Sequence, residues 1–253
     1  MSSIFITGAA SGIGKATAIY FHNKGWFVGL ADRDQDGLKR LQEELGQQRC
    51  CPLVMDVTKV ETIETAFETF KESGGGTLDI LFNCAGILYM GKHESISLEE
   101  QQRIINVNVT GVLNCIHAAL PFLKATPGAR IISMSSASAV YGIPQLAVYS
   151  ASKHAIRGLT EALNIEFAEF DVHVSDIMVP YVNTPMLNKA EHKAASIKKI
   201  GVGISSEQVA DAVWHAGLGK RVHWRVSVSM YMFSFVNWAF PFARRSLIKL
   251  TAS

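Results

Sequence analysis

Short apolar runs alternate with longer segments of helical periodicity along most of the chain, and this alternation restricts the possible folds more than any other sequence feature. The expected strands are Ile4–Ile6, Phe27–Ala31, Pro52–Met55, Ile80–Phe82, Arg130–Met134 and Val172–Val179. The expected helices are Gly14–Lys24, Gln35–Gly46, Val60–Glu72, Leu98–Lys124 and Tyr149–Phe170. Because the strand runs lack polar alternation, they indicate a parallel sheet with helices on both faces. The sequence therefore predicts an α/β protein with a single doubly wound domain over residues 1–253.

Composition narrows the class of protein further. Hydrophobic residues make up 48% of the chain and charged residues 18%, which favours a large core and excludes wholesale disorder. The net charge of +2 provides no basic field, so nucleic acid is not an expected partner. Cys50, Cys51, Cys84 and Cys115 lack the spacing of zinc ligands, and adjacent cysteines rarely reach disulfide geometry. We therefore expect no metal site and a reduced, cytoplasmic environment.

A glycine-rich turn, Thr7–Gly14, directly follows the first expected strand and opens a helix. A bound pyrophosphate needs a tight turn, close approach of the backbone and a helix N-terminus that points at it. Glycine meets the first two needs without steric conflict. The position of the turn predicts nucleotide binding by a Rossmann-type domain, although its glycines are spaced more widely than in the ordinary fingerprint. The residues expected to contact the nucleotide here are Gly8, Ser11, Gly12, Ile13 and Gly14.

Asp32 ends the second expected strand, where an acidic residue binds ribose hydroxyls in such domains. A carboxylate there repels a 2′-phosphate and favours NAD over NADP. The adjacent Arg33 is able to pair with such a phosphate, so NADP stays open as the alternative. Further expected cofactor contacts are Asp56 and Val57 after the third strand and Asn83, Ala85 and Gly86 after the fourth.

Tyr149 and Lys153 lie four residues apart at the start of an expected helix and therefore share one helix face. A tyrosine with a pKa near 10 is a poor base at neutral pH. A nearby ammonium group favours the phenolate, lowers that pKa and improves proton transfer. Ser136 follows the fifth strand, where its hydroxyl is positioned to hold a substrate oxygen beside the phenol; Ser135 is the competing candidate.

In this order, these motifs resemble the short-chain dehydrogenase/reductase family, in the branch whose subunits have about the length of this chain. The resemblance covers about residues 3 to 225. It implies that Tyr149 is the general acid/base, that Lys153 binds the nicotinamide ribose and lowers the tyrosine pKa, and that Ser136 stabilises the reacting oxygen. It also implies that Asn108, and not Asn106, holds a water molecule of the proton relay.

The same resemblance identifies the segment after the sixth strand as the nicotinamide contact. The expected contacts there are Pro180, Val182 and Thr184. The family usually has Pro-Gly at this point, whereas this chain has Pro180–Tyr181, so a tyrosine is expected to add bulk to the pocket.

The resemblance places a substrate lid at residues 185–205, with the basic residues Lys189, His192, Lys193, Lys198 and Lys199. These charges indicate either attraction of an anionic substrate or an ordinary solvated helix face. The expected substrate contacts are Leu88, Tyr141, Tyr181 and Met186. Because they are mostly apolar and aromatic, they favour a medium-sized hydrophobic alcohol or ketone over a sugar.

After an expected helix at Ser205–Gly217 and strand at Trp224–Val228, the tail (residues 226–253) departs from the commonest family pattern. Val226–Ala243 contains no charged residue but does contain three serines, Asn237 and Pro241, which disfavours a spanning helix. Core or subunit packing, a lid over an apolar substrate and contact with a membrane surface all remain open for this tail.

We therefore predict an oxidoreductase that transfers a hydride between NAD and a hydrophobic secondary alcohol or ketone. The alternatives are an NADP-dependent carbonyl reductase and a non-catalytic nucleotide-binding or scaffold protein. A pure binding protein does not need the full set of asparagine, serine, tyrosine and lysine. Relatives pair their long helices, here Leu98–Lys124 and Tyr149–Phe170, so we expect a homodimer or homotetramer.

Overall fold

The sheet at the centre of the molecule contains seven strands, all parallel, in the order β3-β2-β1-β4-β5-β6-β7. The computed structural model describes residues 1–74, 76–188, 190 and 192–252, with the backbone alone of residues 247 and 250–252. The strands are β1 (Ser3–Thr7), β2 (Phe27–Asp32), β3 (Cys50–Val54), β4 (Ile80–Asn83), β5 (Arg130–Met134), β6 (His173–Met178) and β7 (His223–Arg225). The predicted fold, a doubly wound Rossmann-type domain, is confirmed.

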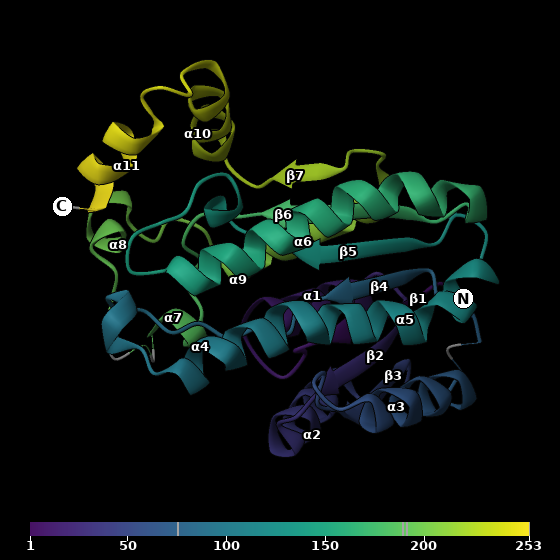
Figure 1. The fold of residues 1–253 in the computed structure, drawn as a ribbon. Helices are drawn as coiled ribbons and strands as arrows, with labels where there is room; N and C mark the ends of the chain where they lie inside the picture. The colour runs from purple at the N-terminus through teal and green to yellow at the C-terminus, as the bar shows by residue number, and fades with distance from the viewer. Residues whose placement is uncertain (75, 189, 191, 253) are drawn as a thin grey trace.

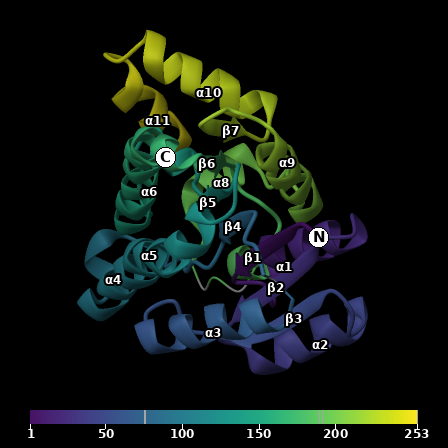
Figure 2. The ribbon, with the colours of Figure 1, turned by 90° about the vertical axis from the view of Figure 1, so that its right-hand side faces the viewer.

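Helices cover both faces of this sheet, as Figure 2 shows for α1, α2 and α9 on one face and α3, α5 and α6 on the other. The helices of the doubly wound body are α1 (Gly12–Asn23), α2 (Gln35–Leu45), α3 (Val60–Glu72), α4 (Leu98–Ile105), α5 (Gly111–Lys124), α6 (Ala147–Glu166) and α9 (Ser206–Leu218). The remaining α-helices are α7 (Pro185–Asn188), α8 (Ala195–Ile200), α10 (Val228–Ala239) and α11 (Arg244–Ala252). Each face therefore has its own apolar core, one around Phe5 and the other around Phe21.

Two expected strand boundaries are wrong for identifiable reasons. β3 begins at Cys50, before the expected Pro52, because an edge strand tolerates a proline that lacks the N–H donor. The expected final strand ends at Arg225, because Ser227 accepts a hydrogen bond from the Met230 N–H and caps the start of α10. The remaining fold boundaries lie within a few residues of those predicted.

The long stretch Leu98–Lys124 is not one regular α-helix. A π-helical turn, Asn106–Thr110, separates α4 from α5 and adds a residue to the helical repeat at that point. Such turns frequently mark functional sites. Among the described residues, Leu98–Lys124 is also the helical stretch that is long and apolar enough to cross a membrane by length and composition. Its buried side packs against the sheet, as expected for a core helix.

The tail forms the two helices α10 and α11, which project from the body of the molecule (Figure 1). Helix α11 packs against α8 and α10 against β7, and both tail helices lie at the end of the sheet to which the strand arrows point in Figure 1. This end of a doubly wound sheet is where ligands bind.

Candidate active site

A cleft of about 630 Å³ opens at the carboxyl end of the sheet, where β1 and β4 lie side by side although they are not consecutive in the sequence. This is the topological switch point of the sheet, and the volume is typical of a cofactor or small-molecule site. Most of the predicted cofactor contacts line it: Gly8, Ser11, Gly12, Ile13, Asp32, Arg33, Asp56, Val57, Ala85, Gly86, Tyr149, Lys153, Pro180, Val182 and Thr184. Gly14, Asn83 and Asn108 lie outside the lining of the cleft.

The glycine turn forms a cradle in which side chains do not fit. A Cβ atom on Gly14 would lie 2.1 Å from the carbonyl oxygen of Gly8, and one on Gly8 would lie 2.9 Å from the Cα atom of Ala85. Gly8 also has a φ of +72°, which L side chains rarely adopt. Thr7 fixes the neighbouring loop, because its Oγ1 accepts hydrogen bonds from the N–H groups of Cys84 and Ala85 at 3.0 Å. Gly8, Ser11 and Gly12 of the turn line the cleft, which suits a close approach of a phosphate group to their backbone.

Asp32 lies in the cleft at the end of β2, where both carboxylate oxygens accept backbone hydrogen bonds. They come from the N–H groups of Ala10 and Asp34, each at 3.0 Å. Arg33 is exposed beside it. The carboxylate therefore stabilises the turn and still presents negative charge to the cleft.

Asp56, the next acidic residue of the cleft, has a pKa below its ordinary value. Burial acts to raise this pKa, but hydrogen bonds from Thr58 and the positive charges of Lys59 and Arg33 outweigh that effect. Asp56 therefore stays a carboxylate, suited to accept hydrogen bonds from a ligand in this part of the cleft.

Tyr149 and Ser136 face each other in the cleft. Ser136 Oγ accepts hydrogen bonds from the N–H of Ser138 at 3.2 Å and from Ser138 Oγ at 2.9 Å. Its own hydroxyl proton points to the Tyr149 phenol, and this hydrogen bond acts to lower the pKa of that tyrosine. The competing Ser135 is buried, and its Oγ has no hydrogen-bond partner among the described residues. This geometry favours Ser136 over Ser135.

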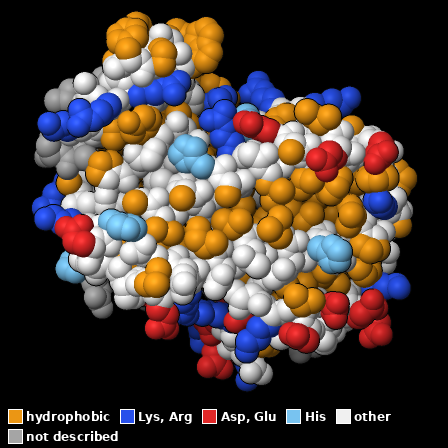
Figure 3. Space-filling model, viewed as in Figure 1, with side chains coloured by type: hydrophobic (Ala, Val, Ile, Leu, Met, Phe, Trp, Pro, Cys, Tyr) orange, Lys and Arg blue, Asp and Glu red, His pale blue; other side chains and the backbone are white. Residues whose placement is uncertain are grey.

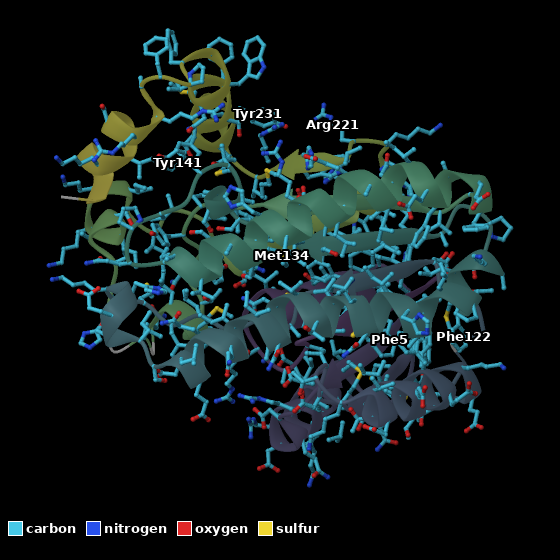
Figure 4. The ribbon with its side chains drawn as sticks, in the orientation of Figure 1. Phe5, Phe122, Met134, Tyr141, Arg221 and Tyr231 are labelled. Atoms are coloured by element: carbon cyan, nitrogen blue, oxygen red, sulfur yellow. The ribbon has the colours of Figure 1, made fainter. Side chains whose placement is uncertain are left out.

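The ammonium group of Lys153 is buried, and its Nζ donates a hydrogen bond to the carbonyl of Met134 at 2.8 Å. Met134 ends β5, which lies behind α6 in Figure 4. Nζ lies 5.5 Å from the centroid of the Tyr149 ring. Burial lowers the pKa of Lys153 from 10.5 to about 8, against the opposing effects of Cys84 and Asp176.

Burial shifts the pKa of Tyr149 in the direction opposite to the one expected from the nearby ammonium group. Burial raises the pKa of Tyr149 to about 12, and the hydrogen bond with Ser136 only partly offsets this shift. Desolvation dominates because the ring lies against the apolar cluster around Ile143 and Leu146. In this state the tyrosine is a neutral phenol that holds its proton.

Asn108 acts behind the cleft wall. It is buried in the π-helical turn, where its amide accepts a hydrogen bond from Ile87 N–H at 2.8 Å and donates one to Ile87 O at 3.0 Å. It also donates to Ser152 Oγ at 3.3 Å, and Ser152 Oγ donates to the carbonyl of Tyr149 at 2.7 Å. Asn108 thus connects the loop after β4 with the helix that carries Tyr149, whereas Asn106 is exposed.

The segment after β6 crosses the cleft opposite the glycine turn. Thr184 lies 3.5 Å from the position of a Cβ on Gly12, and Val182 pairs with Ile204 in an isolated bridge. The Tyr181 hydroxyl lies 2.6 Å from Ser196 Oγ, at the start of α8. The extra bulk of Tyr181 therefore connects the segment after β6 with the predicted lid. Lys189 of that lid lies outside the described residues.

The substrate half of the cleft is apolar, but it is not lined by all of the expected residues. Leu88, Tyr181 and Met186 line it, whereas Tyr141 does not. Tyr141 packs instead against the neighbouring apolar cluster, near the tail helices (Figure 4). Apolar lining residues that sequence reasoning missed are Ile143, Leu146, Ile200, Met230, Phe233 and Ile248. The last three come from the tail, and only its apolar composition signals them in the sequence.

A second feature missed in the sequence lies behind Lys153. Asp176 is fully buried on β6, and its Oδ1 lies 2.9 Å from Nδ1 of His223, whose Nε2 lies 3.1 Å from Glu161 Oε1. Burial raises the pKa of Asp176, while His223 acts to lower it. His223 thus connects a buried carboxyl group near the active-site lysine with the surface of α6.

Two other kinds of chemistry find no support in this cleft. Burial raises the pKa of Cys84 to about 12, so its thiol is a poor nucleophile. Within the part of the chain that the structure describes, three or more histidine, cysteine or acidic side chains nowhere gather as they would around a metal ion.

Comparison with known proteins identifies the family. Residues 2–195 match the family described as short chain dehydrogenase. A cyclohexanol dehydrogenase of Acinetobacter sp. (strain SE19) is 31% identical over 213 residues, covering 82% of this chain and 84% of the relative. An uncharacterised oxidoreductase of Staphylococcus aureus (strain MRSA252) is 32% identical over 211 residues, covering 83% and 88%. The chain therefore belongs to the short-chain dehydrogenase family of oxidoreductases.

Solved structures agree with this assignment. A 3-ketoacyl-(acyl-carrier-protein) reductase from Brucella melitensis, complexed with NADH, has a TM-score of 0.80 and 29% identity, covering 89% of this chain and 96% of that one. A short-chain dehydrogenase/reductase from Burkholderia phymatum, in complex with NAD, has a TM-score of 0.86 and 22% identity, covering 96% and 95%. The second similarity concerns the fold alone.

Proposed function

We propose that this protein is a nicotinamide-dependent oxidoreductase that interconverts a hydrophobic secondary alcohol and its ketone. The observation that carries the proposal is the grouping of the Tyr149 phenol, the Ser136 hydroxyl and the Lys153 ammonium group in one cleft with the glycine cradle. Cyclohexanol is a cyclic secondary alcohol, and the relative that is named for oxidising it supports this substrate class.

The chain's own residues fit a nicotinamide dinucleotide. The glycine turn lines the cleft at Gly8, Ser11 and Gly12, so a pyrophosphate is able to approach its backbone, and Asp32 presents a carboxylate for ribose hydroxyls. The segment from Pro180 to Thr184 faces the substrate half of the cleft and suits the nicotinamide ring. The cofactor, when bound, supplies the hydride chemistry.

Proton transfer falls to Tyr149. In ketone reduction the phenol donates its proton to the carbonyl oxygen, and in alcohol oxidation the phenolate removes the hydroxyl proton. The raised pKa of Tyr149 fits the first role directly. Ser136 donates its hydroxyl proton to the same substrate oxygen, because Ser138 already satisfies its Oγ as an acceptor. In its charged form, Lys153 favours the phenolate that oxidation requires.

We further propose a preference for NAD over NADP. Asp32 carries the argument, because its carboxylate lines the cleft at the end of β2 and would repel a 2′-phosphate there. Arg33 is exposed and lies in the same part of the cleft, so the NADP-dependent carbonyl reductase is the second candidate. The ratio of kcat/KM with NADH and NADPH decides between them.

Oligomerisation is a further part of the proposal. The outer sides of α5 and α6 expose the apolar side chains of Leu113 and Ile165, and hydrophobic side chains gather there in Figure 3. We expect these helices to pair in a homodimer or homotetramer. Light scattering of the purified protein measures the mass that tests this.

The decisive experiment replaces Tyr149 with phenylalanine. We expect Tyr149→Phe to lose at least about a hundred-fold in kcat on a panel of secondary alcohols and ketones, the usual contribution of a positioned acid/base group. Tyr141→Phe is the matched control, because Tyr141 lies outside the cleft lining, and it should keep its activity. Retained turnover in Tyr149→Phe contradicts the mechanism. Binding of NAD without turnover of any alcohol or ketone by the parent protein favours a non-catalytic role.

A further inference from the structure

Helix α10 is apolar on both of its sides. Met230 is buried and Phe233 lines the cleft on the inner side. The outer side and the turn after it expose a continuous row of large apolar side chains, of which Trp238 is 75% and Phe242 83% exposed. We name this row the apolar crest: Val228, Met232, Phe235, Trp238, Phe240 and Phe242. A helix that is apolar all round is normally buried, so the crest calls for a partner that covers it.

The charges around the crest all have the same sign. Residues 212–253 contain six lysines and arginines and no aspartate or glutamate, whereas the rest of the chain has 18 basic and 22 acidic residues. Figure 3 shows Lys and Arg side chains in a row directly beneath the hydrophobic side chains at the top of the molecule. Within the described part of the chain, Arg221, Arg225, Arg244 and Arg245 form no salt bridge with a carboxylate. The tail is therefore a local cationic surface on a nearly neutral protein.

Two of these arginines also contact Tyr231, near the N-terminal end of α10. Arg221 donates a hydrogen bond to the Tyr231 hydroxyl at 3.2 Å, and the two side chains lie together in Figure 4. The Arg225 guanidinium lies 5.6 Å from the centroid of the same ring. The tail thus has exposed aromatic side chains next to a cluster of arginines. Surfaces that bind at a membrane interface have the same arrangement, because the aromatic rings enter the headgroup level and the cations contact anionic lipid.

A second copy of the chain suits this surface less well. Two crests facing each other would bring two cationic belts together without acidic residues between them, because residues 212–253 contain none. An anionic bilayer supplies apolar cover and negative charge at once. Helix α10 has 12 residues, or about 18 Å at the ordinary helical rise, too short for the bilayer core of about 30 Å. The geometry therefore fits a helix that lies in the interface and does not span it.

We propose that the apolar crest docks the protein on the surface of an anionic lipid bilayer. The docking does not depend on the proposed reaction. Its consequence for the substrate rests on the proposed function. Met230, Phe233 and Ile248, on the inner sides of α10 and α11, line the cleft. A docked protein thus places the apolar half of its cleft next to the membrane, and an apolar alcohol or ketone dissolved in the bilayer enters from there.

Co-sedimentation of the full-length protein with vesicles tests the docking. We expect binding to vesicles of phosphatidylcholine mixed with phosphatidylglycerol, and weaker binding to phosphatidylcholine alone or at high salt. Phe235→Ser with Trp238→Ser should weaken binding by about ten-fold or more for each ring removed from the interface. Arg244→Gln with Arg245→Gln should weaken it by about five-fold for each charge, on the anionic vesicles only.

Val60→Ser is the matched control, because Val60 is 47% exposed on α3, away from the tail and from the helices proposed to pair. It should bind vesicles like the parent protein. All variants should keep their turnover of a small water-soluble alcohol, which separates a failure of docking from a failure of the proposed function. Absence of binding to every vesicle overturns the proposal. So does a crest variant that falls to a smaller oligomer while its vesicle binding is unchanged, because the crest would then be a contact between subunits.

Discussion

Replacing Lys153 with methionine should change how the stability of this protein depends on pH. Lys153 is 6% exposed, and no carboxylate lies within salt-bridge distance of its Nζ among the described residues. A buried charge without an ion-pair partner destabilises the folded state. Methionine has a similar length and no charge, so Lys153→Met removes this penalty together with the ammonium group that the mechanism uses.

The magnitude follows from the pKa. Burial lowers the pKa of Lys153 from 10.5 in the unfolded chain to about 8 in the folded protein. Between these values the unfolded state binds more protons, so the free energy of unfolding of the parent protein rises with pH. The destabilising effect of the buried charge on the folded protein is absent above pH 10.5. It reaches its full size as the pH falls through about 8. From about pH 7 to about pH 9.5 the linkage relation gives a gain of about 2 kcal/mol.

Urea unfolding of both proteins across this pH range measures the effect. The difference in unfolding free energy, parent minus Lys153→Met, should grow by about 2 kcal/mol with rising pH. Lys39→Met, which removes an exposed lysine of α2, is the matched control and should show no such change. A parallel pH dependence of the parent and Lys153→Met would refute the reasoning, because the ammonium group would then be solvated in the folded protein.

Three further substitutions test the rest of the site. Asp32→Ala should lower the NADH-to-NADPH ratio of kcat/KM, and equal values in the parent protein would remove the argument for NAD. Gly14→Ala should abolish nucleotide binding in a titration, since its Cβ would lie 2.1 Å from a backbone oxygen. Gly158 has open space around it, so Gly158→Ala should instead stabilise α6 by about 1 kcal/mol. His223→Gln should cost about 2 kcal/mol in urea unfolding, because it weakens the contact of buried Asp176; an unchanged midpoint would contradict this.

The fold was predictable because its signals are local. Each strand of a covered parallel sheet is a short apolar run, and each covering helix repeats its apolar residues with the helical period. Val60–Glu72 and Arg130–Met134 match their predictions at both ends. The π-helical turn at Asn106–Thr110 was not predictable, since its residues continue the helical pattern on either side.

Most of the candidate site was also predictable in position, although the roles of its residues remain predictions. Parallel strands end at one edge of the sheet, so motifs that directly follow strands gather there. Gly8, Asp32 and Ser136 each follow a strand or end one, and all three line the cleft. Tyr141 does not follow this rule, since it lies in the loop between β5 and α6, where packing decides its direction.

By itself, the sequence determined the succession of strands and helices along the chain, the glycine turn and the set of polar groups available for proton transfer. Only the tertiary structure decided the protonation of Tyr149 and Lys153, the burial of Asp176 and the split of α10 into a cleft side and an exposed crest. The physical reason is the distance along the chain over which the responsible interactions act. Strand and turn preferences depend on neighbours in the chain, whereas desolvation and exposure depend on residues that the fold brings together from distant segments.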